Sequence, residues 1–260
     1  MQFDAQVYGN LPFRWAVCSD TGRIRQVNED AHLVEPETGL FVVSDGMGGH
    51  PGGKIASEFV VSDLSVTIDT ELHKLRSVNQ RAVRRLIKKA IYQHSNQVIQ
   101  EGQSEAGFKG MGATVVLALL HDGRVTIANL GDSRIYRYRN GRLMQLSQDH
   151  SVINELIQEG KLLPEYAQDH DAEGIITQYM GMKEIPEPHI RSFGLHPEDR
   201  LLLCSDGLTA MLSDKTIQMT LSQNLSPQKA VQSLVDQANE AGGYDNITVV
   251  VIDWSSKPGL

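Results

Sequence analysis

Apolar residues follow two patterns along this chain. Short apolar runs bounded by turn residues are typical of buried strands, and apolar residues spaced three or four apart are typical of helices that cover a core. The strands predicted from the runs span residues 15–19, 31–34, 40–43, 114–120, 124–130, 133–138, 142–146, 201–204 and 247–253. The predicted helices span residues 54–72, 152–157 and 213–221, with two more that open at Ser77, where Gln80 would complete a capping box, and at Ser226, ahead of Pro227.

The order of these elements predicts the fold class. Asp122-Gly123 and Asn140-Gly141 lie between neighbouring runs and are strong hairpin signals, so the middle strands should form an antiparallel meander. Strand-rich segments alternate with pairs of helices, which favours an α+β fold with helices packed outside antiparallel sheets. Residues 147–192 are irregular, and we interpret them as a flap inserted into a single domain of residues 1–260.

Composition narrows the class of protein. The chain has 260 residues, 40% of them hydrophobic and 22% charged, which is ordinary for a globular protein with a buried core. Its net charge of −8 argues against a nucleic-acid-binding surface. No apolar run approaches the ~20 residues of a membrane span, Met1–Arg14 lacks the pattern of a secretory signal, and the two cysteines make no disulfide framework. We therefore expect a cytoplasmic protein that binds neither nucleic acid nor membrane.

The sharpest local signal follows the apolar run that ends at Val43. Asp45 comes soon after it, and five of the eight residues from Gly46 to Gly53 are glycine. Glycine lets the backbone adopt positive φ and approach a ligand closely. A carboxylate fixed beside such bare backbone suits a cation or a phosphate. A tight strand-to-helix turn would use the same residues, so this stretch alone leaves both interpretations open.

Acidic residues stand at or near the ends of several predicted strands, namely Asp30, Asp45, Asp132, Asp206 and Asp245. Any one of them is typical of a turn. Carboxylates that converge at one edge of a sheet repel each other and raise each other's pKa unless a cation neutralises them. Oxygen ligands without a matching cysteine or histidine cluster suit Mg²⁺ or Mn²⁺ and not Zn²⁺. If these strand ends meet, the sequence predicts a site for a hard divalent metal.

Six short motifs, taken together, connect the chain to a known family. They are Arg25-x-x-x-Glu29-Asp30, Asp45-Gly46-Met47-Gly48-Gly49-His50, Gly112-x-Thr114, Gly131-Asp132-Ser133-Arg134, Ser205-Asp206-Gly207 and Asp245-Asn246. With them the chain resembles the metal-dependent serine/threonine protein phosphatases of type 2C, in their compact bacterial form, from Ser19 to about Trp254. The resemblance implies a β-sandwich of two antiparallel sheets with a pair of helices on each side, a four-layer αββα arrangement.

The resemblance also implies a set of metal ligands. Asp45 would bridge two ions, Mg²⁺ or Mn²⁺, and the carbonyl of Gly46 would complete the coordination of one of them. Asp132, together with Asp206, would hold a third, weaker ion. The remaining carboxylate ligands would be Asp30, Asp206 and Asp245. The implied substrates are proteins or peptides phosphorylated on serine or threonine.

These residue types suit phosphoester hydrolysis without a protein nucleophile. Two metals about 3.5–4 Å apart lower the pKa of a bridging water, and the resulting hydroxide would attack phosphorus directly. By resemblance, Glu29 would hold metal-bound water and Arg25 would bind the phosphate, for which a planar guanidinium is well shaped. His50 is a candidate general acid for the leaving oxygen. The alternatives are an exposed loop histidine for His50 and an ordinary surface arginine for Arg25.

Three other functions compete with this interpretation. Gly48–Lys54 matches the Gly-x-x-x-x-Gly-Lys loop of P-loop NTPases, but Ile55 stands where serine or threonine should hold Mg²⁺, and the hairpins argue against a parallel nucleotide-binding sheet. A cysteine-based phosphatase is rejected, because neither Cys18 nor Cys204 has an arginine at the required spacing. A catalytically silent phosphopeptide-binding relative would be expected to lose metal carboxylates, and here all of them are present.

The flap departs from the family pattern. Many bacterial members carry a basic or aromatic segment where this chain has Asp169-His170-Asp171-Ala172-Glu173-Gly174. An acidic flap would disfavour strongly acidic phosphopeptides near the site. The physiological substrate, the choice between Mg²⁺ and Mn²⁺ and the oligomeric state are not readable from the sequence, although a monomer is favoured.

Overall fold

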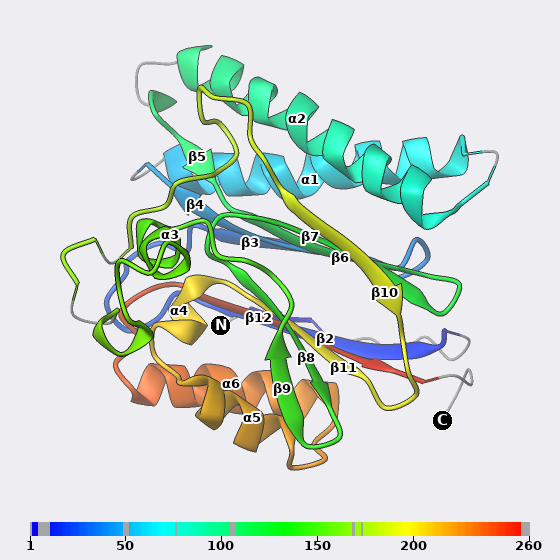
Figure 1. The fold of residues 1–260 in the computed structure, drawn as a ribbon, viewed down its shortest axis with the longest axis vertical. Helices are drawn as coiled ribbons and strands as arrows, with labels where there is room; N and C mark the ends of the chain where they lie inside the picture. The colour runs from blue at the N-terminus through cyan, green and yellow to red at the C-terminus, as the bar shows by residue number, and fades with distance from the viewer. Residues whose placement is uncertain are drawn as a thin grey trace.

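Two antiparallel sheets stacked face to face form the centre of the molecule (Figure 1). The computed structural model describes residues 2–4, 11–48, 52–75, 77–104, 108–167, 170–172 and 174–255. Sheet 1 has the strand order β1-β2-β12-β11-β8-β9. Its strands are β1 (Gln2–Asp4), β2 (Phe13–Asp20), β8 (Arg134–Arg139), β9 (Arg142–Gln145), β11 (Arg200–Cys204) and β12 (Ile247–Trp254).

Sheet 2 has the strand order β10-β7-β6-β4-β3, and a short strand, β5, pairs with the end of β4. Its strands are β3 (Asp30–Glu35), β4 (Leu40–Met47), β5 (Gly112–Ala113), β6 (Val115–His121), β7 (Arg124–Leu130) and β10 (His189–Gly194). The chain passes from sheet 2 to sheet 1 between β7 and β8, so the residues of this link lie where the two sheets meet.

Helices cover the outer face of each sheet (Figure 1). The helices α1 (Gly52–His73) and α2 (Gln80–Ser104) contact sheet 2, and α5 (Asp214–Leu221) and α6 (Pro227–Glu240) contact sheet 1. Three short helical segments lie elsewhere: α3 (Val152–Gln158), the 3-10 turn η2 (Pro164–Tyr166) and α4 (Asp206–Thr209). In the part of the chain that the structure describes, no helix has the length and apolar character to cross a membrane.

The apolar side chains form three layers of core, which explains why the strands appear in the sequence as continuous apolar runs. In β4 all four residues from Leu40 to Val43 are fully buried. Successive side chains of a strand point to opposite faces, so Leu40 and Val42 pack beneath α1 and α2 while Phe41 and Val43 pack between the sheets. The third layer lies between sheet 1 and the helices α5 and α6. This four-layer α+β sandwich is the fold class expected from the sequence.

Most predicted elements are present, and two predictions were wrong in detail. Ser226 does cap α6, since its hydroxyl accepts a hydrogen bond from the Lys229 N–H. The second helix, however, begins at Gln80 and is capped by Asn79, whose side-chain oxygen accepts a hydrogen bond of 3.0 Å from the Ala82 N–H. Asn79 is itself a favoured cap residue, and it removes the need for the expected cap at Ser77.

The second difference concerns the flap. Residues 189–192, expected to belong to it, are the first part of β10, which pairs with β7 at the edge of sheet 2. The sequence hides this strand because an edge strand is only half covered and keeps polar side chains. The polar residues His189, Arg191 and Ser192 are interspersed with Ile190 and Phe193, so no apolar run forms.

Candidate active site

The ends of four strands meet at one edge of the sandwich and bring acidic side chains together. Asp30, at the start of β3, lies directly opposite Asp45, near the end of β4. Asp206 lies just after β11, and Asp245 lies just before β12. Because β11 and β12 pair antiparallel, both residues lie at the same end of sheet 1. Asp132 lies in the link between β7 and β8. Both sheets therefore contribute carboxylates to the same place, which is the convergence that a metal site needs.

Close backbone approaches hold these segments together. A Cβ atom on Gly46 would lie 2.0 Å from the carbonyl oxygen of Gly53, at the start of α1. A Cβ atom on Gly207 would lie 2.0 Å from the carbonyl oxygen of Asn246. No side chain fits at either distance, so glycine is needed where α1 packs on β4 and where α4 packs on the segment that leads into β12. The glycine-rich stretch thus serves close packing around the carboxylates.

Hydroxyl groups fix the carboxylate-bearing backbone. The Asp45 N–H donates to the Thr114 hydroxyl at 3.0 Å, and that hydroxyl shares a hydrogen bond of 2.7 Å with Ser133. The Ser205 hydroxyl donates to a carboxylate oxygen of Asp30 at 2.7 Å. Sequence reasoning gave these hydroxyl residues no role. The sequence did contain a hint of this role, because each of these residues lies within one of the short motifs that carry the family resemblance.

Asn246 holds the loop between β2 and β3. Its side-chain oxygen accepts a hydrogen bond of 2.8 Å from the Glu29 N–H, and its amide nitrogen donates to the carbonyls of Thr21 at 2.9 Å and Val27 at 3.0 Å. This loop carries Arg25, so one buried amide fixes both ends of the segment that presents the guanidinium. Sequence reasoning also missed this role.

Arg25 lies over the carboxylate cluster. Its Nη2 atom donates to Asp245 at 2.8 Å, and the side chains are 49% and 34% exposed, respectively. The Asp245 carboxylate raises the pKa of Arg25, as do, more weakly, Glu29 and Asp45. Because half of the guanidinium side chain remains open to solvent, it can reach an incoming anion while staying beside the carboxylates.

Burial and mutual repulsion perturb the carboxylates strongly. Burial, with the charges of Asp206 and Asp245, raises the pKa of Asp30 to about 7. Burial, with Asp206 and Asp149, raises the pKa of Asp132 to about 7. The pKa values of Asp45 and Asp206 are also raised, in both cases chiefly by burial, and further by the charge of Asp30 for Asp45 and of Asp245 for Asp206. Without a counter-charge, then, the cluster favours protons.

The arrangement fits a divalent cation. Among the described residues, one oxygen each of Asp30, Asp132 and Asp206 is buried and accepts no hydrogen bond. Asp45 and Asp206 are close enough for the Asp206 charge to raise the pKa of Asp45, in addition to burial. No group of three or more of the described acidic, histidine or cysteine side chains is already spaced to hold a metal ion. A divalent cation would neutralise the carboxylates and use the oxygens that lack partners, which is the all-oxygen donor set that Mg²⁺ and Mn²⁺ prefer.

The remaining predicted residues are placed as follows. Glu29 is buried beside the cluster, and its carbonyl accepts a hydrogen bond of 3.2 Å from the Gly46 N–H. His50 lies outside the described residues, so its role as general acid stays a prediction. The structure thus brings together Arg25, Glu29, Asp30, Asp45, Gly46, Asp132, Asp206 and Asp245.

Comparison with known proteins agrees with the resemblance seen in the motifs. The sequence model of the protein phosphatase 2C family matches residues 23–249. Protein phosphatase PhpP of Streptococcus pneumoniae is 37% identical over 246 residues, which cover 93% of this chain and 98% of that protein.

Solved structures of phosphatases are also similar to this chain. Serine/threonine phosphatase Stp1 from Staphylococcus aureus superposes with a TM-score of 0.86 at 31% identity, covering 98% of this chain and 100% of the other. The catalytic domain of the phosphatase PstP, in complex with 2 manganese ions, gives a TM-score of 0.79 at 31% identity, with 94% and 99% coverage. The chain therefore belongs to the protein phosphatase 2C family and is a serine/threonine protein phosphatase.

Proposed function

We propose that the carboxylate edge of the sandwich is a divalent-metal centre that hydrolyses phosphoserine and phosphothreonine monoesters. The observation that carries this proposal is the convergence of buried carboxylates, with Asp30 opposite Asp45 and one oxygen each of Asp30, Asp132 and Asp206 that accepts no hydrogen bond. Carboxylates at this density are stable at neutral pH only with bound cations or protons. The proposed metal ligands are the carboxylates Asp30, Asp45, Asp206 and Asp245 and the carbonyl of Gly46.

The metal content is proposed as two Mg²⁺ or Mn²⁺ ions with a third, weaker ion at Asp132 and Asp206. The related PstP structure contains manganese, which supports the class of metal. In this chain Asp45 is the residue best placed to bridge, because it lies opposite Asp30 across β3 and β4 and close enough to Asp206 and Asp132 for their charges to raise its pKa. Glu29, buried beside them, would orient water at the site.

The chemistry divides between the cations and the side chains. When bound, the cations would supply a hydroxide near neutral pH and positive charge for the phosphoryl oxygens. Arg25 would bind the phosphoryl group through guanidinium nitrogens and would stabilise its charge during in-line displacement. His50 would protonate the leaving serine or threonine oxygen. No nucleophilic side chain is required, and both cysteines are buried with raised pKa values, which makes their thiolates scarce.

Substrate choice would depend on the segment between β9 and β10. We propose that it acts as a flap over the site within a single catalytic domain. The exposed Asp171 would disfavour substrates with many acidic residues around the phosphorylated position. We further propose a cytoplasmic monomer, in keeping with the unpaired cysteines.

Turnover of the Asp45→Asn variant tests this function. The assay is release of phosphate from a phosphothreonine peptide in Mn²⁺, with folding checked by circular dichroism. We expect activity to fall by about a thousandfold or more with the fold retained, since removal of one essential electrostatic group already costs about 10²–10³ in rate. Asp122→Asn is the matched control, because Asp122 is an exposed hairpin residue with a φ of 48° that asparagine tolerates. Substantial turnover by folded Asp45→Asn would contradict the proposal.

A further inference from the structure

The exposed face of α2 carries a concentrated positive charge on an otherwise acidic protein. Five basic residues recur at positions that share one helical face, and all are exposed: Arg81, Arg84, Arg85, Lys88 and Lys89. None of them forms an ion pair with a carboxylate in the described part of the chain, whereas Lys54 of the neighbouring helix α1 and Lys74, just after the end of α1, do. With a net charge of −8 for the whole chain, this basic stripe is a local exception.

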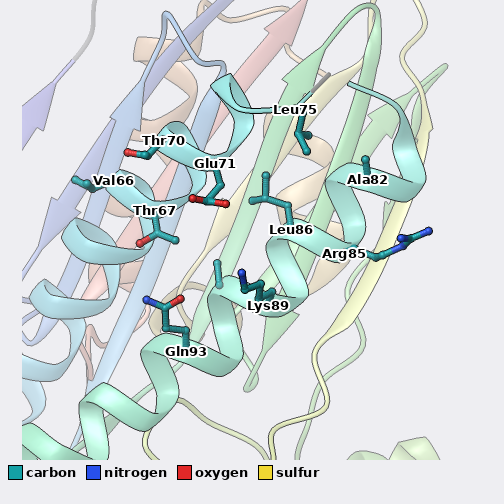
Figure 2. A pocket seen from close by; sticks show the side chains of 11 residues that line it. Val66, Thr67, Thr70, Glu71, Leu75, Ala82, Arg85, Leu86, Lys89 and Gln93 are labelled. Carbon is teal, nitrogen blue, oxygen red and sulfur yellow. The ribbon is translucent and has the colours of Figure 1, made fainter. Parts of the chain in front are cut away.

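A hollow of about 460 Å³ lies between this stripe and α1 (Figure 2). The helix α1 contributes Val66 and Glu71, and α2 contributes Leu86 and Lys89. Leu75, from the connection between the helices, closes one end. The hollow therefore combines an apolar lining with a cationic wall on α2 and an anionic group on α1.

A second, shallower hollow lies on the other side of α2, toward β10. It is lined by Arg84, Arg85 and Lys88 of α2, by Arg81 at its start, and by the apolar side chains of Pro188 and Ile190. Arg85 lines both hollows, and in Figure 2 its side chain points away from α1. The helix α2 thus forms a basic ridge with an apolar recess on each flank.

This surface is remote from the carboxylate cluster. The helix α1 starts at Gly52 beside β4, and Glu71 lies 19 residues further along it, which at a rise of 1.5 Å per residue corresponds to about 28 Å. In Figure 1 the connection between α1 and α2 lies at the opposite end of the molecule from α3 and α4. The hollows are therefore too far away to receive the reacting phosphate.

We propose that the basic ridge of α2 and its flanking hollows dock an acidic, amphipathic segment of a partner protein. Apolar side chains of that segment would enter the hollow beside Leu86, and its carboxylates would lie along the basic stripe, as in helix-in-groove recognition. An anionic membrane would favour a convex apolar ridge, and a nucleic acid would gain nothing from the apolar lining of the recesses. The docking would position partners independently of catalysis, so it goes beyond the proposed function.

Direct binding tests this inference without reference to activity. The probe is a fluorescein-labelled synthetic helix with leucines on one face and glutamates on the other, followed by fluorescence anisotropy at low salt. Wild type should bind it, and Arg85→Glu with Lys89→Glu should weaken binding by about tenfold or more, since attraction becomes repulsion. Thr70→Trp, an exposed substitution that fills the hollow, should also weaken binding.

The matched control is Lys215→Glu with Lys229→Glu, which makes the same charge change on exposed first-turn positions of α5 and α6. This control should bind the probe as wild type does. The inference is overturned if wild type does not bind, if both charge-reversed variants weaken binding equally, or if a lysine version of the probe binds as well. It is also overturned if phosphatidylglycerol vesicles or a single-stranded oligonucleotide, and not the peptide, bind in a way that needs Arg85 and Lys89.

Discussion

Asn246 offers a quantitative test of how the site is assembled. Its side chain is 4% exposed and makes all of its hydrogen bonds to main-chain groups of the loop that carries Arg25. Asn246→Ala removes the acceptor for the Glu29 N–H and the donor for the Thr21 and Val27 carbonyls. These three hydrogen bonds, at about 1 kcal/mol each, predict a loss of about 3 kcal/mol in the free energy of unfolding.

The loop should also lose its fixed position. Arg25 would then meet the phosphate in many orientations, so the KM for a phosphopeptide should rise together with the loss of stability. Asn246→Asp is an informative companion, because a carboxylate can still accept from the Glu29 N–H but cannot donate to the two carbonyls. Its added negative charge next to Asp245 should make it at least as destabilising as alanine near neutral pH.

Urea denaturation in EDTA is the appropriate assay, since bound metal would add its own stabilisation. Gln223→Ala serves as the control, because Gln223 is exposed and its side chain makes no hydrogen bond to the described residues. It should change the free energy of unfolding by less than about 0.5 kcal/mol. A change of the same small size for Asn246→Ala would refute the claim that this amide holds the loop.

Two further predictions concern charges at the site. Arg25→Ala should chiefly raise KM for phosphorylated substrates with a smaller effect on kcat, measured by steady-state kinetics; an unchanged KM would make Arg25 a structural residue. The second uses the pKa of Asp132, raised to about 7 in the folded protein by burial and nearby carboxylates. A group with a raised folded-state pKa stabilises below its unfolded value of about 4 and loses that contribution as pH rises to about 7. In EDTA, Asp132→Asn should therefore have a higher Tm than wild type near pH 8, and this gain in Tm should shrink as the pH falls toward 4; a lower Tm near pH 8 would contradict this.

The sequence alone predicted those helices and strands whose formation depends on residues close together in the chain. Residues 40–43 are apolar at every position because both faces of β4 are buried, and this leaves a run that is visible without the structure. Ser226 and Pro227 mark the start of α6 by chemistry that operates within one turn. The strand β10 was missed because an edge strand mixes polar and apolar side chains, and the cap at Asn79 was missed because Ser77 offered a similar pattern nearby.

In the candidate active site, too, some residues could be predicted from the sequence and others could not. Its carboxylates stand next to strand ends and glycines, so the sequence marked them as candidates and the structure brings them together. The residues that hold them could not be found that way. Asn246 contacts Glu29 across 217 positions of sequence, and Ser205 contacts Asp30 across 175. Only the three-dimensional pairing of two sheets gives such polar residues their partners.

The most direct test of a metal-dependent centre is a calorimetric titration of EDTA-treated, dialysed protein with Mn²⁺, on wild type and Asp45→Asn. The account predicts that wild type binds two ions with a weaker third, and that Asp45→Asn loses the strong binding, because Asp45 is the proposed ligand that bridges the two ions. Phosphate release measured on the same samples should follow occupancy. Full turnover by wild type in excess EDTA, or Mn²⁺ binding that Asp45→Asn leaves unchanged, would contradict the proposed centre.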